Sequence, residues 1–163
     1  MESNQQDPTP QGCFKIEELQ TFQTFEGQIL QDVYYYMWLN RQPEGEPSYR
    51  FIYYLELLFD SHESLLLTSG EDSDAIHVGH TEDLLGTAER LRELHGVITI
   101  QRVHAGNFPL WQPALVHPLE AIRLSKHESG LYLNDALLLD FGRQQVLVQL
   151  SARDGLELSV YEN

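Results

Sequence analysis

Basic side chains are scarce in this chain. Ten Lys and Arg residues face 25 Asp and Glu residues, which gives a formal net charge of −15 at pH 7. A surface this negative repels phosphate groups and anionic lipids, so the composition predicts no nucleic-acid partner and no membrane partner. A basic protein is the kind of partner that the charge favours, although solubility alone also explains an acidic surface.

Cysteine and long apolar runs are scarce as well. Cys13 is the only cysteine, which excludes an intramolecular disulfide and fits a reducing compartment. The first residues show no basic stretch followed by an apolar one, so no secretory signal is expected. The longest apolar run, residues 33–39, is too short to span a bilayer. We therefore expect a cytoplasmic protein.

The familiar catalytic signatures are missing from the sequence. It contains no Gly-x-Ser-x-Gly elbow, no phosphate-binding Gly-x-x-x-x-Gly-Lys loop, no Gly-x-Gly-x-x-Gly turn and no His-Glu-x-x-His helix. The corresponding hydrolases, nucleotide-binding proteins and metalloproteases are therefore disfavoured. No cofactor is expected, and whether the protein is an enzyme stays open, with a non-catalytic role favoured.

A pattern of alternating apolar residues occurs twice. Leu55, Leu57 and Phe59 recur 82 positions later as Leu137, Leu139 and Phe141 (141 − 59 = 82). Strands with short connections surround both copies, so each half predicts an antiparallel β-meander. We interpret residues 28–80 and 119–161 as two half-repeats of a rough internal duplication.

The remaining segments complete an α+β fold. Residues 1–12 are polar and are expected to form a disordered leader, and residues 13–163 a single domain. A short N-terminal helix is predicted over residues 14–25. A longer central helix is predicted over residues 81–95, with Thr81 as N-cap and Gly96 as C-terminal stop, and it should cover one face of a sheet.

Aromatic residues are concentrated in the first predicted strands. Tyr34, Tyr36 and Trp38 alternate along one strand and so share a face, and Tyr54 of the next strand can lie across from them. In that next strand, alternation places residues 51, 53, 55, 57 and 59 on one face. The aromatic face is either a binding surface for a ligand or partner, or one layer of the core beneath a helix.

Residues 107–118 form a Pro-rich loop that carries Trp111 and is flanked by His104 and His117. Loops are common places for binding residues, which makes Trp111 a second candidate contact for a ligand or partner. The alternative is that Trp111 anchors the loop to the core.

His77 and His80 are the candidate metal ligands. They lie three positions apart, with Asp72, Asp74, Glu82 and Asp83 nearby. Imidazole and carboxylate groups bind divalent transition metals, but a solvated acidic loop before a helix explains the same residues.

These observations lead to three functional hypotheses. The first is a non-catalytic acidic protein-binding module, such as an inhibitor, an adaptor or an immunity-like protein. The second is a small-molecule-binding domain that uses the aromatic face. The third is an enzyme with a non-classical site built from His104, His117 and carboxylates. The sequence does not indicate an oligomeric state.

Overall fold

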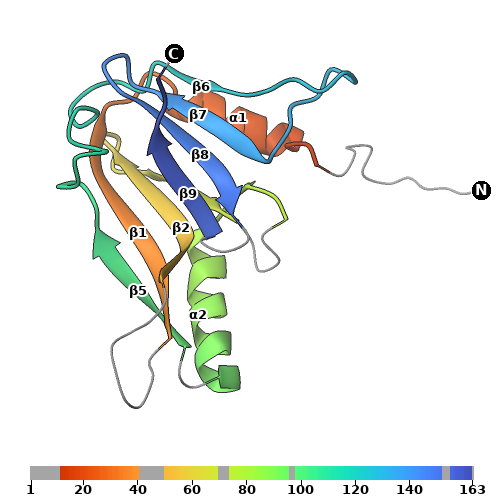
Figure 1. Ribbon diagram of the computed structural model, residues 1–163, viewed down its shortest axis with the longest axis vertical. Coiled ribbons are helices and arrows are strands. Elements are labelled where there is room, and N and C mark those ends of the chain that lie inside the picture. The colour runs from red at the N-terminus through yellow and green to blue at the C-terminus, as the bar shows by residue number, and fades with distance from the viewer. Residues whose placement is uncertain (1–11, 41–49, 70–73, 96–97, 152–154, 163) are drawn as a thin grey trace, which may run out of the picture.

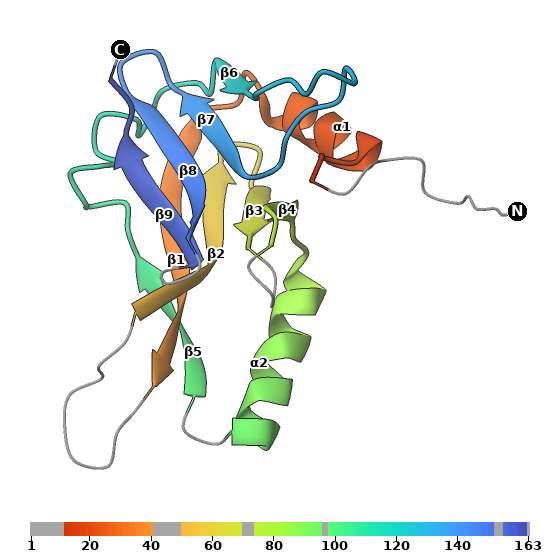
Figure 2. The ribbon, with the colours of Figure 1, turned by 45° about the vertical axis from the view of Figure 1, so that its right-hand side comes forward.

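The described part of the chain folds into one curled, mostly antiparallel sheet with two helices (Figures 1 and 2). The computed structural model describes residues 12–40, 50–69, 74–95, 98–151 and 155–162; the expected leader, apart from Gly12, lies outside these ranges. No helix within them is long and apolar enough to cross a membrane. The elements are α1 (Ile16–Phe25), β1 (Leu30–Asn40), β2 (Arg50–Phe59), β3 (Ser64–Thr68), β4 (His77–Val78), α2 (Thr81–His95), β5 (Ile98–His104), β6 (Ala121–Arg123), β7 (Ala136–Asp140), β8 (Gln145–Ser151) and β9 (Gly155–Val160).

Strand β2 is the branch point of the sheet. It pairs with β1 along its length, with β3 from Tyr54 to Leu58, and with β9 through a single parallel pair, Ile52 and Gly155. Two antiparallel runs, β2–β3–β4 and β7–β8–β9, therefore meet at β2. Strand β5 extends the sheet on the other side of β1, and β6 extends it beyond β7.

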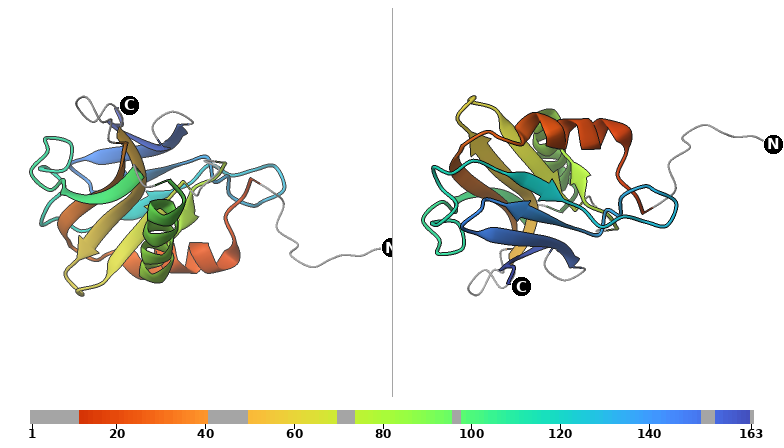
Figure 3. Two further views of the ribbon diagram at one scale, coloured as in Figure 1. Left: turned by 90° about the horizontal axis from the view of Figure 1, so that it is seen from below. Right: turned by 90° about the horizontal axis from the view of Figure 1, so that it is seen from above.

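The sheet returns on itself at the start of β1. The Leu30 N–H donates to the His117 carbonyl, and the Leu119 N–H donates to the Gln28 carbonyl, just before β6 begins. These bonds connect the β6 end of the sheet to β1, so the described strands surround a common core in the end-on views (Figure 3). The fold is thus a partly closed, mixed sheet with helices at its margins.

Helix α1 closes the gap that the curled sheet leaves open. Its apolar edge carries Phe22 and Phe25, both buried, and the rings pack against Phe14 and Phe59 at centroid distances of 5.1 and 5.2 Å. The helix begins at Ile16, after the buried Phe14, so it is shorter than the predicted 14–25. The amphipathic pattern of α1 places its apolar residues on one side, and their burial holds the helix against the sheet.

Two glutamates of this region also accept hydrogen bonds from backbone N–H groups of the edge strands. Glu18 Oε2 accepts a hydrogen bond from the Val78 N–H of β4 (3.0 Å), and Glu26 Oε2 accepts one from the Ile122 N–H of β6 (2.8 Å). A carboxylate is a strong acceptor for a backbone donor. Short edge strands with occupied donors are poor templates for unwanted pairing.

The residues of the repeated pattern lie in the main core. Leu55, Leu57 and Phe59 have no exposed area, and their counterparts Leu137, Leu139 and Phe141 are at most 2% exposed. This burial explains why alternation was visible in both halves, because one face of each strand must be apolar throughout.

The predicted alternation is wrong for the first residues of β2, because the strand contains a β-bulge. Tyr36 pairs with Tyr54 whereas Met37 pairs with Ile52, so Tyr53 is an extra residue in β2. The extra residue shifts the faces by one position. Phe51 and Tyr53 therefore pack with Tyr54 in a second apolar cluster, while residues 55, 57 and 59 stay in the main core.

Helix α2 covers this second cluster. Its bounds, Thr81–His95, coincide with the predicted central helix. Leu84 is 4% exposed and packs with Phe51, Tyr53, Tyr54 and Leu66. The backbone of Gly79 lies against the Tyr54 ring so closely that a side chain at position 79 would overlap it. The α+β arrangement with a covering helix follows from these contacts.

Truncating the core phenylalanines tests this packing. Phe59→Ala and Phe141→Ala should each lower the free energy of unfolding by about 3–5 kcal/mol, because a buried aromatic ring is lost and a cavity remains. Phe108→Ala is the control, since that ring is 39% exposed; its cost should stay near 0.5 kcal/mol. Urea unfolding followed by circular dichroism gives the values. A surface-like cost at Phe59 or Phe141 would contradict the described core.

Candidate functional site

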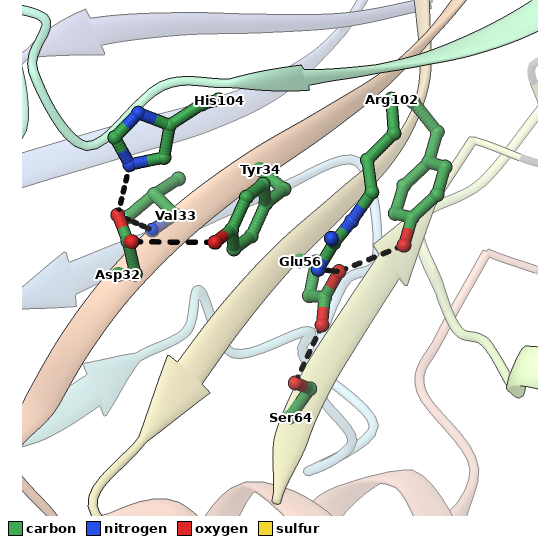
Figure 4. Close-up of polar contacts among 8 residues, drawn as sticks. Asp32, Val33, Tyr34, Glu56, Ser64, Arg102 and His104 are labelled. Atoms are coloured by element: carbon green, nitrogen blue, oxygen red, sulfur yellow. Dashed lines mark hydrogen bonds and ion pairs between the residues drawn. The ribbon is translucent and has the colours of Figure 1, made fainter. Parts of the chain in front are cut away.

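The outer face of β5, β1, β2 and β3 carries a connected set of polar side chains, shown in Figure 4, which we call the polar cluster. Alternate residues of each strand face the same side, so the pairing register decides which of them meet. Tyr34 lies opposite His104 and Glu56, and Tyr36 lies opposite Arg102. The members of the cluster are Asp32, Tyr34, Tyr36, Glu56, Ser64, Arg102 and His104.

Asp32 organises the first half of the cluster. A hydrogen bond of 2.6 Å joins its Oδ1 to His104 Nε2, and the Tyr34 hydroxyl donates to its Oδ2 (3.3 Å). The backbone N–H of Val33 also donates to Oδ1 (3.0 Å). Gly106 lies directly over this pair, and a side chain there would overlap the Asp32 carboxylate. A glycine at position 106 is thus a steric requirement of the Asp32–His104 contact.

Glu56 organises the second half. It accepts hydrogen bonds from Tyr36 (2.8 Å) and Arg102 (3.1 Å) on one carboxylate oxygen and from Ser64 (2.7 Å) on the other. The two halves are joined by Arg102, whose guanidinium carbon lies 3.6 Å from the centre of the Tyr34 ring. A cation over an aromatic face is attracted by the ring quadrupole.

The protonation states of the cluster follow from these contacts. Burial and the Asp32 carboxylate raise the pKa of Tyr34, and burial and the hydrogen bond to Glu56 raise the pKa of Tyr36. Both phenols therefore remain protonated donors at neutral pH. Burial opposes the charge on Arg102, but its hydrogen bond to Glu56 prevails and raises its pKa.

The aromatic residues predicted as a binding surface have different surroundings. Tyr34 and Tyr36 belong to the polar cluster. Trp38 is half-buried and stacks on Phe51 at 4.7 Å, and its Nε1 has no hydrogen-bond partner among the described residues. Tyr54 is 3% exposed and lies beneath α2. Trp38 and Tyr54 therefore lie on the same sheet face as the polar cluster but belong to the second apolar cluster beneath α2.

Trp111 is a core residue in this conformation. Its side chain has no exposed area, and its indole N–H donates to the Tyr35 hydroxyl (2.7 Å). The loop is anchored through this residue. His117 contributes its backbone carbonyl to the Leu30 N–H, whereas His104 points to Asp32. The Asp32–His104 pair was not predicted, although Asp32 shares its strand face with Tyr34 and Tyr36.

The predicted metal ligands are directed to other partners or to solvent. His77 Nδ1 lies 3.7 Å from Glu18 Oε2, and His80 is exposed at the start of α2. In the part of the chain that the structure describes, no three His, Cys, Asp or Glu side chains are grouped to hold an ion. Asp72 lies outside the described residues.

Two surface hollows lie away from the polar cluster. Each has a volume of about 210 Å³, one between α1 and β6 around Phe22, Ile122 and Tyr132, and the other over β7 and β8 around Leu138, Leu147 and Tyr161. Pockets for small organic ligands are generally larger, about 300–1,000 Å³. Hollows of this size are better suited to accept a side chain of a partner than to enclose a small organic ligand.

The chain matches no protein-family model, no curated protein and no solved structure. Its function must therefore be argued from the polar cluster itself.

The His77–Glu18 pair gives a pH prediction. The hydrogen bond to Glu18 raises the pKa of His77 above its ordinary 6.5. Burial opposes the charge on Glu18, but bonds to His77, Lys15 and Val78 prevail and lower its pKa below 4.5. The contribution of His77 to folding stability is present below pH 6.5 and is lost as pH rises through the raised pKa of His77. The glutamate contribution is present above pH 4.5 and is lost as pH falls through the lowered pKa.

The melting-temperature difference between wild type and His77→Gln should therefore be largest between pH 4.5 and 6.5 and should shrink toward pH 8. His80→Gln is the matched control, since His80 is exposed. Scanning calorimetry across this pH range makes the measurement. A difference that grows with pH would show that the pairing is misassigned.

Proposed function

We propose that the protein is a non-catalytic binding module that recognises a partner protein through the polar cluster. The observation that carries this proposal is the stack of Arg102 on Tyr34 at the surface of the sheet. Tyrosine and arginine are the residue types that most often dominate the binding energy of protein interfaces. Here both side chains are already held by neighbours, which reduces the conformational entropy lost on binding.

Charge determines which partner suits this surface. The whole chain carries −15, so a basic protein would approach faster than an acidic one. The polar cluster itself has both signs, because the Arg102 guanidinium faces the Glu56 carboxylate. Long-range charge thus supplies steering, and the preorganised tyrosine and arginine supply the close contacts that set the dissociation rate. The single cysteine, Cys13, is buried and free, which supports a reducing compartment such as the cytoplasm.

An enzyme is the second candidate, and the Asp32–His104 hydrogen bond favours it. A carboxylate that orients an imidazole is a common arrangement for proton transfer. However, the Ser64 hydroxyl in the cluster donates to Glu56 and is not presented to His104. This arrangement supports a general acid or base more than a serine nucleophile. Loss of a measured turnover in His104→Ala, with partner binding intact, would favour the enzyme.

We also infer that the antiparallel runs β2–β3–β4 and β7–β8–β9 arose by internal duplication. The support is the equivalence of Leu55, Leu57 and Phe59 with Leu137, Leu139 and Phe141, which are all buried. The first triplet lies in β2, and the second lies in β7 with Phe141 directly after that strand.

Alanine substitutions test the binding proposal. Immobilised wild-type protein is used to capture a partner from an extract, and the purified partner is then titrated in a calorimeter. Tyr34→Ala and Arg102→Ala should each weaken binding by about 30-fold, the effect of a hot-spot residue of about 2 kcal/mol. Tyr161→Ala and Arg143→Ala are matched controls, since both residues are exposed outside the cluster. The control affinities should match wild type.

If all four variants bound the partner as tightly as wild type, the polar cluster would not be the binding surface. Association should also slow steeply as salt increases, because exposed charges are screened beyond about 8 Å at physiological ionic strength. An association rate independent of salt would contradict the role given to charge.

A further inference from the structure

Strand β5 is an edge of the sheet that differs from the other edges. At β4 and β6, a backbone N–H is occupied by Glu18 or Glu26, as described above. Strand β5 is longer, and along its residues 98–104 it pairs only with β1 in the part of the chain that the structure describes. An unpaired strand edge is a template for a further strand.

The hydrogen-bond pattern identifies which backbone groups face outward. The Ala105 N–H donates to the Val33 carbonyl, so Val33 bonds toward β5. Backbone groups alternate sides along a strand, and therefore Tyr35 and Met37 also bond toward β5, opposite Val103 and Gln101. The N–H and C=O groups of the alternate residues Ile100, Arg102 and His104 then point away from β1.

The side chains of these residues are directed over the sheet face: Ile100 packs against the second apolar cluster, and the two polar residues belong to the polar cluster. Charged side chains commonly protect edge strands. Here Arg102 is turned back over Tyr34 and Glu56, and His104 is turned back onto Asp32. The side chains of Arg102 and His104 thus lie over the sheet face within the polar cluster, as Figure 4 shows.

We propose that β5 binds an extended segment of a basic partner protein by strand addition. The inference rests on the proposed function and names how that binding takes place. Main-chain hydrogen bonds from Ile100 and Arg102 hold the added strand, and the adjoining polar cluster contacts its side chains. A second copy of this chain is a poor occupant, because two molecules of charge −15 repel each other.

The test uses a synthetic ten-residue peptide of alternating lysine and valine and the full-length protein. Peptide binding should slow amide exchange at Ile100 and Arg102, while Gln101 and Val103, already bonded to β1, should change little. A lysine–proline peptide of equal charge, which cannot form a strand ladder, and a glutamate–valine peptide should not produce this protection. Hydrogen exchange followed by NMR reports each amide separately.

A second test changes the protein instead of the peptide and uses the substitution Ile100→Pro. Proline removes an outward donor without removing a bond to β1, so the fold should persist. It should weaken peptide binding about tenfold or more relative to Ile100→Ala, which loses the side chain but keeps the N–H. Equal melting temperatures of the two variants show that the strand is intact, and the exchange measurement on wild type does not depend on either variant.

Three results would overturn strand addition: no peptide binding at millimolar concentration, equal binding of the lysine–proline peptide, or a dimer of the protein that protects the same amides. If the peptide fails while Tyr34→Ala and Arg102→Ala still lose the captured partner, the polar cluster stays the binding surface and strand addition is wrong. If the peptide binds through β5 while those variants keep the partner, the proposed surface fails instead.

Discussion

The structure depends on how a curled sheet satisfies the backbone groups at its margins. A sheet that closes completely has no edges, whereas this sheet branches at β2 and leaves β4, β5 and β6 at its margins. Each unpaired backbone donor that is withdrawn from water must find an acceptor. Glu18 and Glu26, eight positions apart in the α1 region, supply acceptors for β4 and β6 (26 − 18 = 8). The buried rings of Phe22 and Phe25 hold the helix where those carboxylates can reach.

The same constraint explains the character of the outer face. Strand β5 receives no such carboxylate from α1, and its Arg102 and His104 side chains instead contact Glu56 of β2 and Asp32 of β1. The polar cluster therefore connects β5, β1, β2 and β3 laterally, while the aromatic layer of Tyr54, Phe51 and Trp38 connects β1 and β2 beneath α2. Strand pairing and side-chain bonding together hold Tyr34 and Arg102 in one arrangement, which is the property that a binding surface needs.

Local patterns made part of this fold predictable. The apolar stripe of residues 81–95 gave the correct bounds of α2, and alternation correctly placed residues 55, 57 and 59 in the core. Thr81 is not the N-cap, because the carbonyl of His80 accepts the first helical hydrogen bond from Leu84; the predicted stop, Gly96, lies outside the described residues. The bulge at Tyr53 was not predicted, because an extra residue is visible only when the partner strand is known. The parallel Ile52–Gly155 pair and the closure of the sheet at Leu30 depend on contacts far apart in the chain.

The candidate site was partly predictable for the same reason. Alternation placed Tyr34 and Tyr36 on one face, but Asp32 and His104 are 72 positions apart, and their contact is not visible in the sequence. The sequence left Trp111 with two possible roles, a binding contact or an anchor of its loop, and the side chain is buried in the core. Side chains that meet through strand register cannot be deduced from a single sequence, because a shift of one residue exchanges the two faces.

Amide hydrogen exchange in the free protein tests the central claim most directly. If α1 satisfies β4 and β6 while β5 stays open, the amides of Val78 and Ile122 should exchange slowly and those of Ile100 and Arg102 quickly. Slow exchange at Ile100 and Arg102, together with fast exchange at Val78 and Ile122, would contradict the account.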